Sequence, residues 1–283
     1  MIYLPVIGAV ALASGLILER LVLKKKKMDI KLYQTASFLA IVIVMLPLIY
    51  FFWGLDSAAF TPWNIFIFAL VVLFSIIANL FTFYSMKWEK VSNLEPAKVL
   101  EPLFVILLAI IFSFFTFGLY ERNLNIILPA IIAALALVFS HVKKHHLDFN
   151  KYFLAAIAGS FFFGLELVIS RLILNYYSPM TFYLFRSLAI FLISLIIFQP
   201  KFSKIDKTSK WHILITGAIW VLYRTIMYYG YLNLGVVFTT LIFMLGPVFV
   251  FAFARIFLKE KLTWRNILAV CVVVGCVAYA VLA

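Results

Sequence analysis

The sequence predicts an all-α integral membrane protein with ten transmembrane helices, arranged as two inverted five-helix repeats. Its composition predicts the membrane, because 66% of the 283 residues are hydrophobic and only 12% are charged. Soluble domains carry about 45–50% apolar and about 25% charged residues. A similarity between the two halves of the chain predicts the repeats. An ordinary soluble protein is therefore excluded.

Ten apolar runs are long enough to cross a bilayer, which takes about 20 residues. The first follows no basic region, so we interpret it as a membrane helix and not as a cleaved signal peptide. Charged and turn-forming segments such as KKKKMDIK separate the runs. Strands of a membrane barrel would alternate in polarity, whereas these runs are apolar on every side. The ten runs lie at 2–23, 32–53, 62–86, 96–117, 123–142, 152–174, 180–199, 210–232, 236–258 and 264–282.

The net charge of +13 reflects topology. Of the 24 Lys and Arg residues, 18 lie in loops that follow odd-numbered runs, and only Arg122 lies in a loop after an even-numbered run. The positive-inside rule places the Lys-rich loops in the cytoplasm and both termini outside. The excess of basic residues therefore gives no reason to expect nucleic acid as a partner.

The two halves align along their length. RLVL beginning at Arg20 corresponds to RLIL beginning at Arg171, and EPLFV beginning at Glu101 corresponds to GPVFV beginning at Gly246. Because each half has five helices, an odd number, the second copy enters the membrane from the opposite side, as in secondary transporters with inverted repeats. We expect a first repeat over 1–142, a cytoplasmic linker over 143–151 and a second repeat over 152–283.

The second half resembles an EamA-type domain of the drug/metabolite transporter superfamily. The resemblance rests on the S-P before SPMTFYLFRSLAIFL with Arg186 shortly after it, on Pro247 within a helix, and on the K-E-K-L turn before the last helix. The first half is similar but degraded, with Pro102 retained and Ser37 where the second half has Arg186. This resemblance implies a ten-helix transporter with a central substrate cavity, and it leaves the substrate open.

Three charged residues within the apolar runs are candidates for a substrate site: Glu166, Arg186 and Arg224. A charge at the centre of a bilayer helix costs about 2.5–3.5 kcal/mol, so it needs a partner or a watery cavity. Two interpretations stay open. The arginines can grip a carboxylate or phosphate, or the three residues form a structural ion network. Glu166 can neutralise an arginine, receive an amine or take up a proton.

Aromatic and apolar side chains share helix faces with these charges. Trp220, Tyr223 and Met227 recur with Arg224 at helical spacing, and Tyr183 shares a face with Arg186. We include these four residues in the candidate substrate-binding set.

A second polar set lies in the half of the membrane predicted to face the cytoplasm. Glu19, Asn79 and Glu101 are candidates for a coupling site or an inner gate. Glu101 also has Glu95 and Lys98 at a spacing of three, which is typical of an interfacial charge ladder. Pro102 and Pro247 each remove a backbone donor at matching places in the two halves, so both are candidate hinges.

No metal or cofactor is expected. Cys271 and Cys276 both fall in the last run, which excludes a disulfide framework and a thiolate metal site. His141 and His145 have a spacing that can bind zinc, but two lysines stand between them, which favours a solvated cationic loop.

The sequence also carries no phosphate-binding, metalloprotease or serine-hydrolase motif, so we do not expect an enzyme or an ATP-driven pump. We expect a secondary active transporter, a permease in the cell membrane that moves an amino acid or organic anion by alternating access. Its partners would be the small-molecule substrate, the lipid bilayer, and a proton or an exchange substrate. Alternatives are efflux of cationic drugs or quaternary amines, flipping of a lipid-linked phosphate, and a membrane scaffold.

Overall fold

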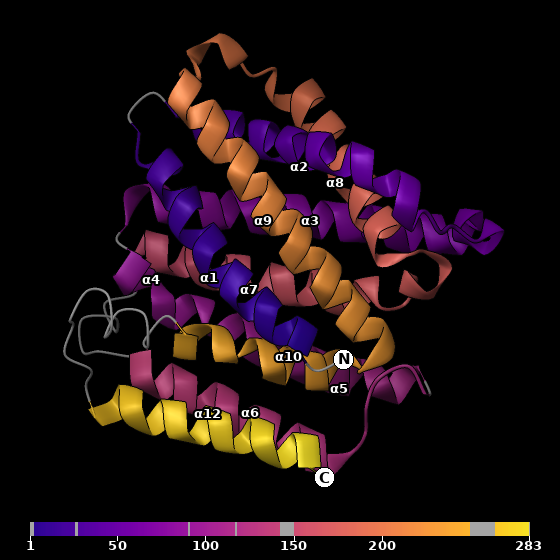
Figure 1. Ribbon diagram of the computed structural model, residues 1–283, viewed down its shortest axis with the longest axis vertical. Helices are drawn as coiled ribbons and strands as arrows, with labels where there is room; N and C mark the ends of the chain where they lie inside the picture. The colour runs from indigo at the N-terminus through magenta and orange to yellow at the C-terminus, as the bar shows by residue number, and fades with distance from the viewer. Residues whose placement is uncertain are drawn as a thin grey trace.

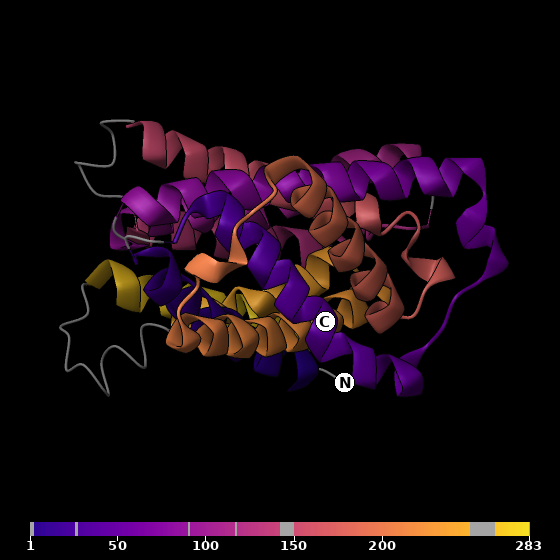
Figure 2. The ribbon, with the colours of Figure 1, turned by 90° about the horizontal axis from the view of Figure 1, so that it is seen from above.

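The computed structural model describes residues 3–25, 28–89, 91–116, 118–141, 150–249 and 264–282. Within these residues the chain is helical, without a β-strand, and the helices lie side by side in one bundle (Figures 1 and 2). Most of the expected linker, together with His145 and its neighbours, lies outside the described residues, as does the K-E-K-L turn.

The helices follow the apolar runs closely. Eight helical segments are long and apolar enough to cross a membrane, and two shorter apolar helices occupy Leu124–Ser140 and Val236–Phe249. The α-helices are α1 (Tyr3–Leu23), α2 (Ile30–Phe52), α3 (Pro62–Trp88), α4 (Val91–Lys98), α5 (Leu100–Phe115), α6 (Leu124–His141), α7 (Lys151–Ser170), α8 (Pro179–Phe198), α9 (Lys207–Asn233), α10 (Val236–Phe243) and α12 (Trp264–Leu282). Short 3₁₀ turns η1 (Ser57–Phe60), η3 (Leu174–Tyr176) and η4 (Phe202–Lys204) lie in the connections.

Polar side chains fix where several helices begin. Thr61 accepts a hydrogen bond from the Asn64 N–H at the start of α3, and Ser178 does the same for Thr181 at the start of α8. In both helices proline occupies the first turn, where its missing donor costs nothing. The T-P and S-P pairs in the sequence thus set these two boundaries.

Two helices are interrupted by a single residue at matching places within the runs at 96–117 and 236–258, where the sequence places Pro102 and Pro247. The first becomes α4 and α5 with a break at Val99, and the second is interrupted at Met244. Each break lies three residues before a proline, Pro102 or Pro247. A proline removes the hydrogen bond to the carbonyl four residues earlier and clashes with it, so α4 and α10 both end at that fourth residue.

The packing joins the two halves of the chain. α3 packs against α7, α1 against α9, α2 against α8, and α6 against α12 at one edge of the bundle (Figure 1). Large apolar side chains remain exposed on the outer faces, such as Ile196 at 70% and Phe115 at 80%. Such a surface suits contact with lipid. The start of α1 and the end of α12 point to the same end of the bundle (Figure 1).

Contacts between loops tie the halves at both ends of the α2–α8 pair. At one end, the Ser178 N–H donates to the Gly54 carbonyl and the Asp56 N–H donates to the Tyr176 carbonyl, each at 2.8 Å. At the other end, Lys25 Nζ lies 3.1 Å from Asp206 Oδ2. These hydrogen bonds and this ion pair hold together helices that surround a cavity between the two halves.

Candidate substrate cavity

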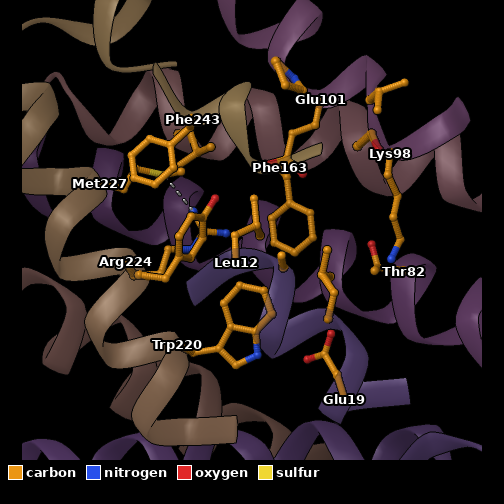
Figure 3. A pocket seen from close by; sticks show the side chains of 18 of the residues that line it. Leu12, Glu19, Thr82, Lys98, Glu101, Phe163, Trp220, Arg224, Met227 and Phe243 are labelled. Atoms are coloured by element: carbon orange, nitrogen blue, oxygen red, sulfur yellow. Dashed lines mark hydrogen bonds between the residues drawn. The ribbon is translucent and has the colours of Figure 1, made fainter. Parts of the chain in front are cut away.

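A cavity of about 770 Å³ lies between the two halves and is lined by residues of both. Its aromatic wall comprises Phe38, Phe83, Phe163, Tyr183, Trp220, Tyr223, Tyr231 and Phe243. The charged residues that line it are Glu19, Arg20, Lys24, Lys98, Glu101, Arg186 and Arg224. The side chains of Glu19 from α1, Lys98 from α4, Glu101 from α5, and Trp220 and Arg224 from α9 project into it (Figure 3). A small polar molecule of about the size of an amino acid fits such a volume.

Glu166 organises a buried ion network at one side of this cavity. Its carboxylate has no exposed surface, and it lies 3.1 Å from Arg186 Nε and 3.4 Å from Arg224 Nη1. The Tyr228 hydroxyl donates to Glu166 Oε1 at 3.0 Å, and Arg186 donates to the Ser75 hydroxyl of α3. The three charges that the sequence singled out therefore meet, and Ser75 connects them to the first half.

The members of this network differ in their access to the cavity. Arg186 and Arg224 line it, whereas Glu166 is not among its lining residues. Glu166 faces the two arginines from behind, so of its three expected roles the geometry supports neutralisation of the guanidinium groups. Breaking such a pair would leave a buried uncompensated charge, which is costly.

Arg224 is held in a defined orientation. Its guanidinium lies 5.3 Å from the Phe163 ring centre and 5.6 Å from that of Tyr223. Nη1 also contacts the sulfur of Met227 at 3.8 Å. The side chain is 6% exposed, and one of its faces is turned to the cavity (Figure 3). Aromatic rings and a carboxylate thus preorganise a cation at the cavity wall.

The other expected polar residues line the same cavity. Glu101 lies within electrostatic range of Arg224 and Glu166 on one side and of Lys98 on the other. Asn79 also lines the cavity, with its side-chain amide donating to the Ser75 carbonyl at 2.7 Å. The two sets that the sequence places at different depths therefore share one cavity, which Pro102 and Pro247 also line.

Lys98 lines the cavity, although it was not among the site residues predicted from the sequence. Its Nζ atom is buried in the cavity wall with no hydrogen-bond partner, between Glu101 and Glu19. Its interaction with Glu101 agrees with the expected spacing of three, and its place in the cavity wall adds an electrostatic interaction with Glu19. The available signal was its position four residues before Pro102, which puts it at the end of α4, directly before the helix break.

Glu19 occupies the neighbouring part of the cavity. It is 4% exposed and interacts with Lys98, Trp220 and Tyr33. The Trp220 indole N–H is buried without a hydrogen bond of acceptable geometry, and in Figure 3 the indole lies beside Glu19.

The cavity extends along α1 to one end of the bundle. Arg20 and Lys24 line it there, and Lys24 is exposed. Further along α9, the Tyr231 hydroxyl lies 3.3 Å from Thr240 Oγ1 of α10, and both residues are buried. The Glu121 carboxylate accepts a hydrogen bond from the Phe238 N–H at 3.2 Å in the first turn of α10, linking a first-half loop to a second-half helix.

Comparisons with known proteins agree with this architecture. Residues 150–282 match the model of the EamA-like transporter family, which confirms the resemblance in the second half of the chain. No curated protein matches the sequence. Among 28 matching chains of solved structures, one crystal structure superposes with a TM-score of 0.69 at 18% identity, over 99% of this chain and 98% of the other. At that identity the likeness shows the fold alone.

Proposed function

We propose that this chain, whose residues 150–282 match the EamA-like transporter family, is a secondary active transporter of the drug/metabolite transporter superfamily for a small metabolite with an anionic group. An amino acid or an organic anion would cross the cell membrane by alternating access. The observation that carries this proposal is Arg224, a buried cation with one face turned to an aromatic-walled cavity. A guanidinium in that position can bind a carboxylate through two parallel hydrogen bonds.

The residues around Arg224 have distinct proposed roles. Trp220, Tyr223, Met227 and Tyr183 form the wall of the substrate site. Arg186 binds Glu166 and Ser75. Its proposed role, together with Glu166, is to position Arg224 and to hold the helices together. Glu19, Asn79 and Glu101 remain candidates for coupling to a proton or for an inner gate.

Alternating access is supported by the symmetry of the helix contacts. We assign ten membrane crossings, the eight long segments and the two shorter ones, to repeats over 1–142 and 152–283 joined by the linker 143–151. Exchanging the repeats turns the α3–α7 contact into the α9–α1 contact, while the α2–α8 and α6–α12 contacts map onto themselves. Such exchange is expected for inverted repeats that rock about a central site.

The broken helices supply the proposed moving parts. Pro102 and Pro247 follow breaks at corresponding positions of the two repeats, and both line the cavity. Discontinuous helices at matching positions often mark the binding region of transporters. Because the cavity reaches Lys24 beside the Lys-rich first loop, we assign this conformation as open to the cytoplasm. A Lys24→Cys variant that a membrane-impermeant thiol reagent labels from outside the cell would overturn this orientation.

Efflux of cationic drugs is less well supported. Tyr223, one of the rings that with Trp220 and Tyr231 would stack on a ligand cation, already faces the guanidinium of Arg224 at 5.6 Å. Glu166, the expected counter-charge for such a ligand, does not line the cavity. An anionic group on the ligand therefore matches the described wall better.

Uptake into proteoliposomes tests the proposal. Purified protein is first screened for ligand-dependent thermal shifts with amino acids, organic acids and quaternary amines. Arg224→Gln should abolish uptake of the best ligand while leaving the melting temperature of the empty protein within a few degrees, and Arg224→Lys should restore it only weakly because one ammonium cannot form the bidentate pair. Uptake by Arg224→Gln at the wild-type rate would refute the assigned site.

A further inference from the structure

Six ionisable side chains of both signs lie in and behind the cavity wall. Arg186 and Arg224 flank Glu166 at 3.1 and 3.4 Å, and Glu101, Lys98 and Glu19 line the same cavity (Figure 3). Glu101 is within electrostatic range of Arg224, Glu166 and Lys98, and Lys98 is also within range of Glu19. We call these six residues the charge chain.

When all six groups are ionised, the formal charges of Arg186, Glu166, Arg224, Glu101, Lys98 and Glu19 sum to zero, with three cations and three carboxylates. Two further basic residues line the cavity, both towards its mouth. Arg20 donates to the Glu89 carbonyl at 3.4 Å and interacts with the Glu89 carboxylate, while Lys24 is exposed. Among the residues that the structure describes, the interior of the cavity therefore presents a balanced set of charges.

Charge balance has a consequence for what the interior can hold. In a low-dielectric cavity an uncompensated charge is expensive, and each additional ion must be neutralised by a partner. A ligand with a net charge would leave the balanced chain with an excess of that charge. We propose that the charge chain makes this cavity selective for polar ligands of zero net charge, zwitterions above all, and that Lys98 and Glu19 set this selectivity.

Lys98 and Glu19 suit this role because their opposite charges belong to the balanced set and lie outside the Arg224 site. A zwitterion can place its anionic group on Arg224 and its cationic group on Glu101. Lys98 then loses Glu101 as a partner but keeps Glu19, and its Nζ makes no hydrogen bond that would have to break first. Glu19 thereby holds the cation that the ligand displaces.

The position of Lys98 couples this exchange to the helix break. Lys98 is the last residue of α4, and Glu101 lies in the first turn of α5, on the other side of Val99. A shift of Lys98 from Glu101 towards Glu19 on α1 changes the attraction across the break. Binding of a ligand cation at Glu101 would therefore act on the segment that we assign as a hinge.

The inference rests on the proposed function, and it is tested with probes of three charges. The neutral probes are glutamine and glycine betaine, the anionic ones are glutamate and succinate, and the cationic ones are lysine and choline. Binding to purified protein in detergent is measured by thermal shift, and uptake is measured in proteoliposomes. The wild-type protein should bind at least one neutral probe roughly tenfold more tightly than either charged class.

Single substitutions should move the preferred charge by one unit. Lys98→Met leaves the chain with an excess negative charge, so the preference should move to a cationic probe. Glu19→Gln leaves an excess positive charge, and the preference should move to an anionic probe. The double variant is balanced again and should recover the preference for neutral probes, a reversal that mere structural damage would not produce.

The possible failures are distinguishable. Preference of the wild-type protein for glutamate, succinate, lysine or choline would overturn the selectivity while leaving transport intact, and so would variants with unchanged preference. A wild-type protein that neither binds nor transports any of the six probes would overturn the proposed function and this inference with it. The melting temperature of each ligand-free variant shows that the folded protein is being compared.

Discussion

Replacing Glu166 by glutamine should destabilise the protein strongly, because this one carboxylate balances two buried cations. At an effective dielectric constant of about 20, unit charges at its two contact distances of 3.1 and 3.4 Å attract by about 5 kcal/mol each. Desolvation offsets much of this attraction, and removing one partner of a buried ion pair typically costs about 3–5 kcal/mol. The two arginines should respond unequally.

Arg186 is 1% exposed and, among the residues that the structure describes, keeps neutral partners such as Ser75 and the Tyr183 ring, whereas Arg224 faces the cavity and can recruit water. We therefore attribute most of the loss to Arg186 and expect Glu166→Gln to lower the free energy of unfolding by about 3–5 kcal/mol. This free energy is measured by denaturing the protein in detergent micelles while the circular dichroism signal of the helices is recorded.

Two variants serve as controls for this prediction. Glu166→Asp keeps the negative charge and should cost less than Glu166→Gln. Tyr228→Phe removes one hydrogen bond to the carboxylate, at 3.0 Å, and should cost about 1.5–3 kcal/mol, as for other bonds to charged groups. If the Glu166→Gln variant unfolds at the same denaturant concentration as the wild-type protein, the buried ion network does not stabilise the fold.

Three other changes have defined outcomes. Gly235 has a φ of +91°, and an added Cβ would collide with the Glu121 carboxylate, whereas Gly118 has a φ of +77° and no described neighbour within 4 Å. Gly235→Ala should therefore lower the melting temperature well beyond the effect of Gly118→Ala, and equal effects would exclude the clash. Hydrogen bonds from Ser209 and then from Lys25 lower the pKa of Asp206 below its ordinary value of 3.8, so its contribution to stability is fully present above that value and is lost as the pH falls through the lowered pKa. Asp206→Asn should flatten the acid limb of a stability-against-pH curve, and an unchanged limb would assign the acid sensitivity to other groups. Pro247→Ala restores a backbone donor and should slow uptake without weakening ligand binding in a thermal-shift titration; unchanged uptake would argue against the hinge.

Much of the fold could be predicted from the sequence. Helix boundaries agree within a few residues where capping side chains mark them, as Ser178 does for α8. The proline effect is equally local, since Pro102 and Pro247 act on carbonyls of their own helices. Proline alone does not decide the outcome, because Pro47 and Pro129 remain inside α2 and α6 without interrupting them.

The candidate site was only partly predictable. Helical spacing brought Trp220, Tyr223 and Arg224 to one face, and all three line the cavity. Spacing could not show that Glu166 would lie behind that wall, because the side of α7 that faces the cavity depends on how α7 packs against α3 and α5. Lys98 was missed for the same reason, since its surroundings come from α1 and not from its own helix.

The sequence by itself determined that this chain is a multi-pass membrane protein whose second half resembles EamA-type transporters, because apolar run length, the distribution of lysines and the proline positions act within short segments. Only the tertiary structure decided which charges meet. Glu19 and Lys98 are distant in sequence, as are Ser75 and Arg186, and electrostatic interactions depend on separation in space and on burial. The balance of the charge chain, on which the proposed ligand selectivity rests, therefore exists only in the packed helices.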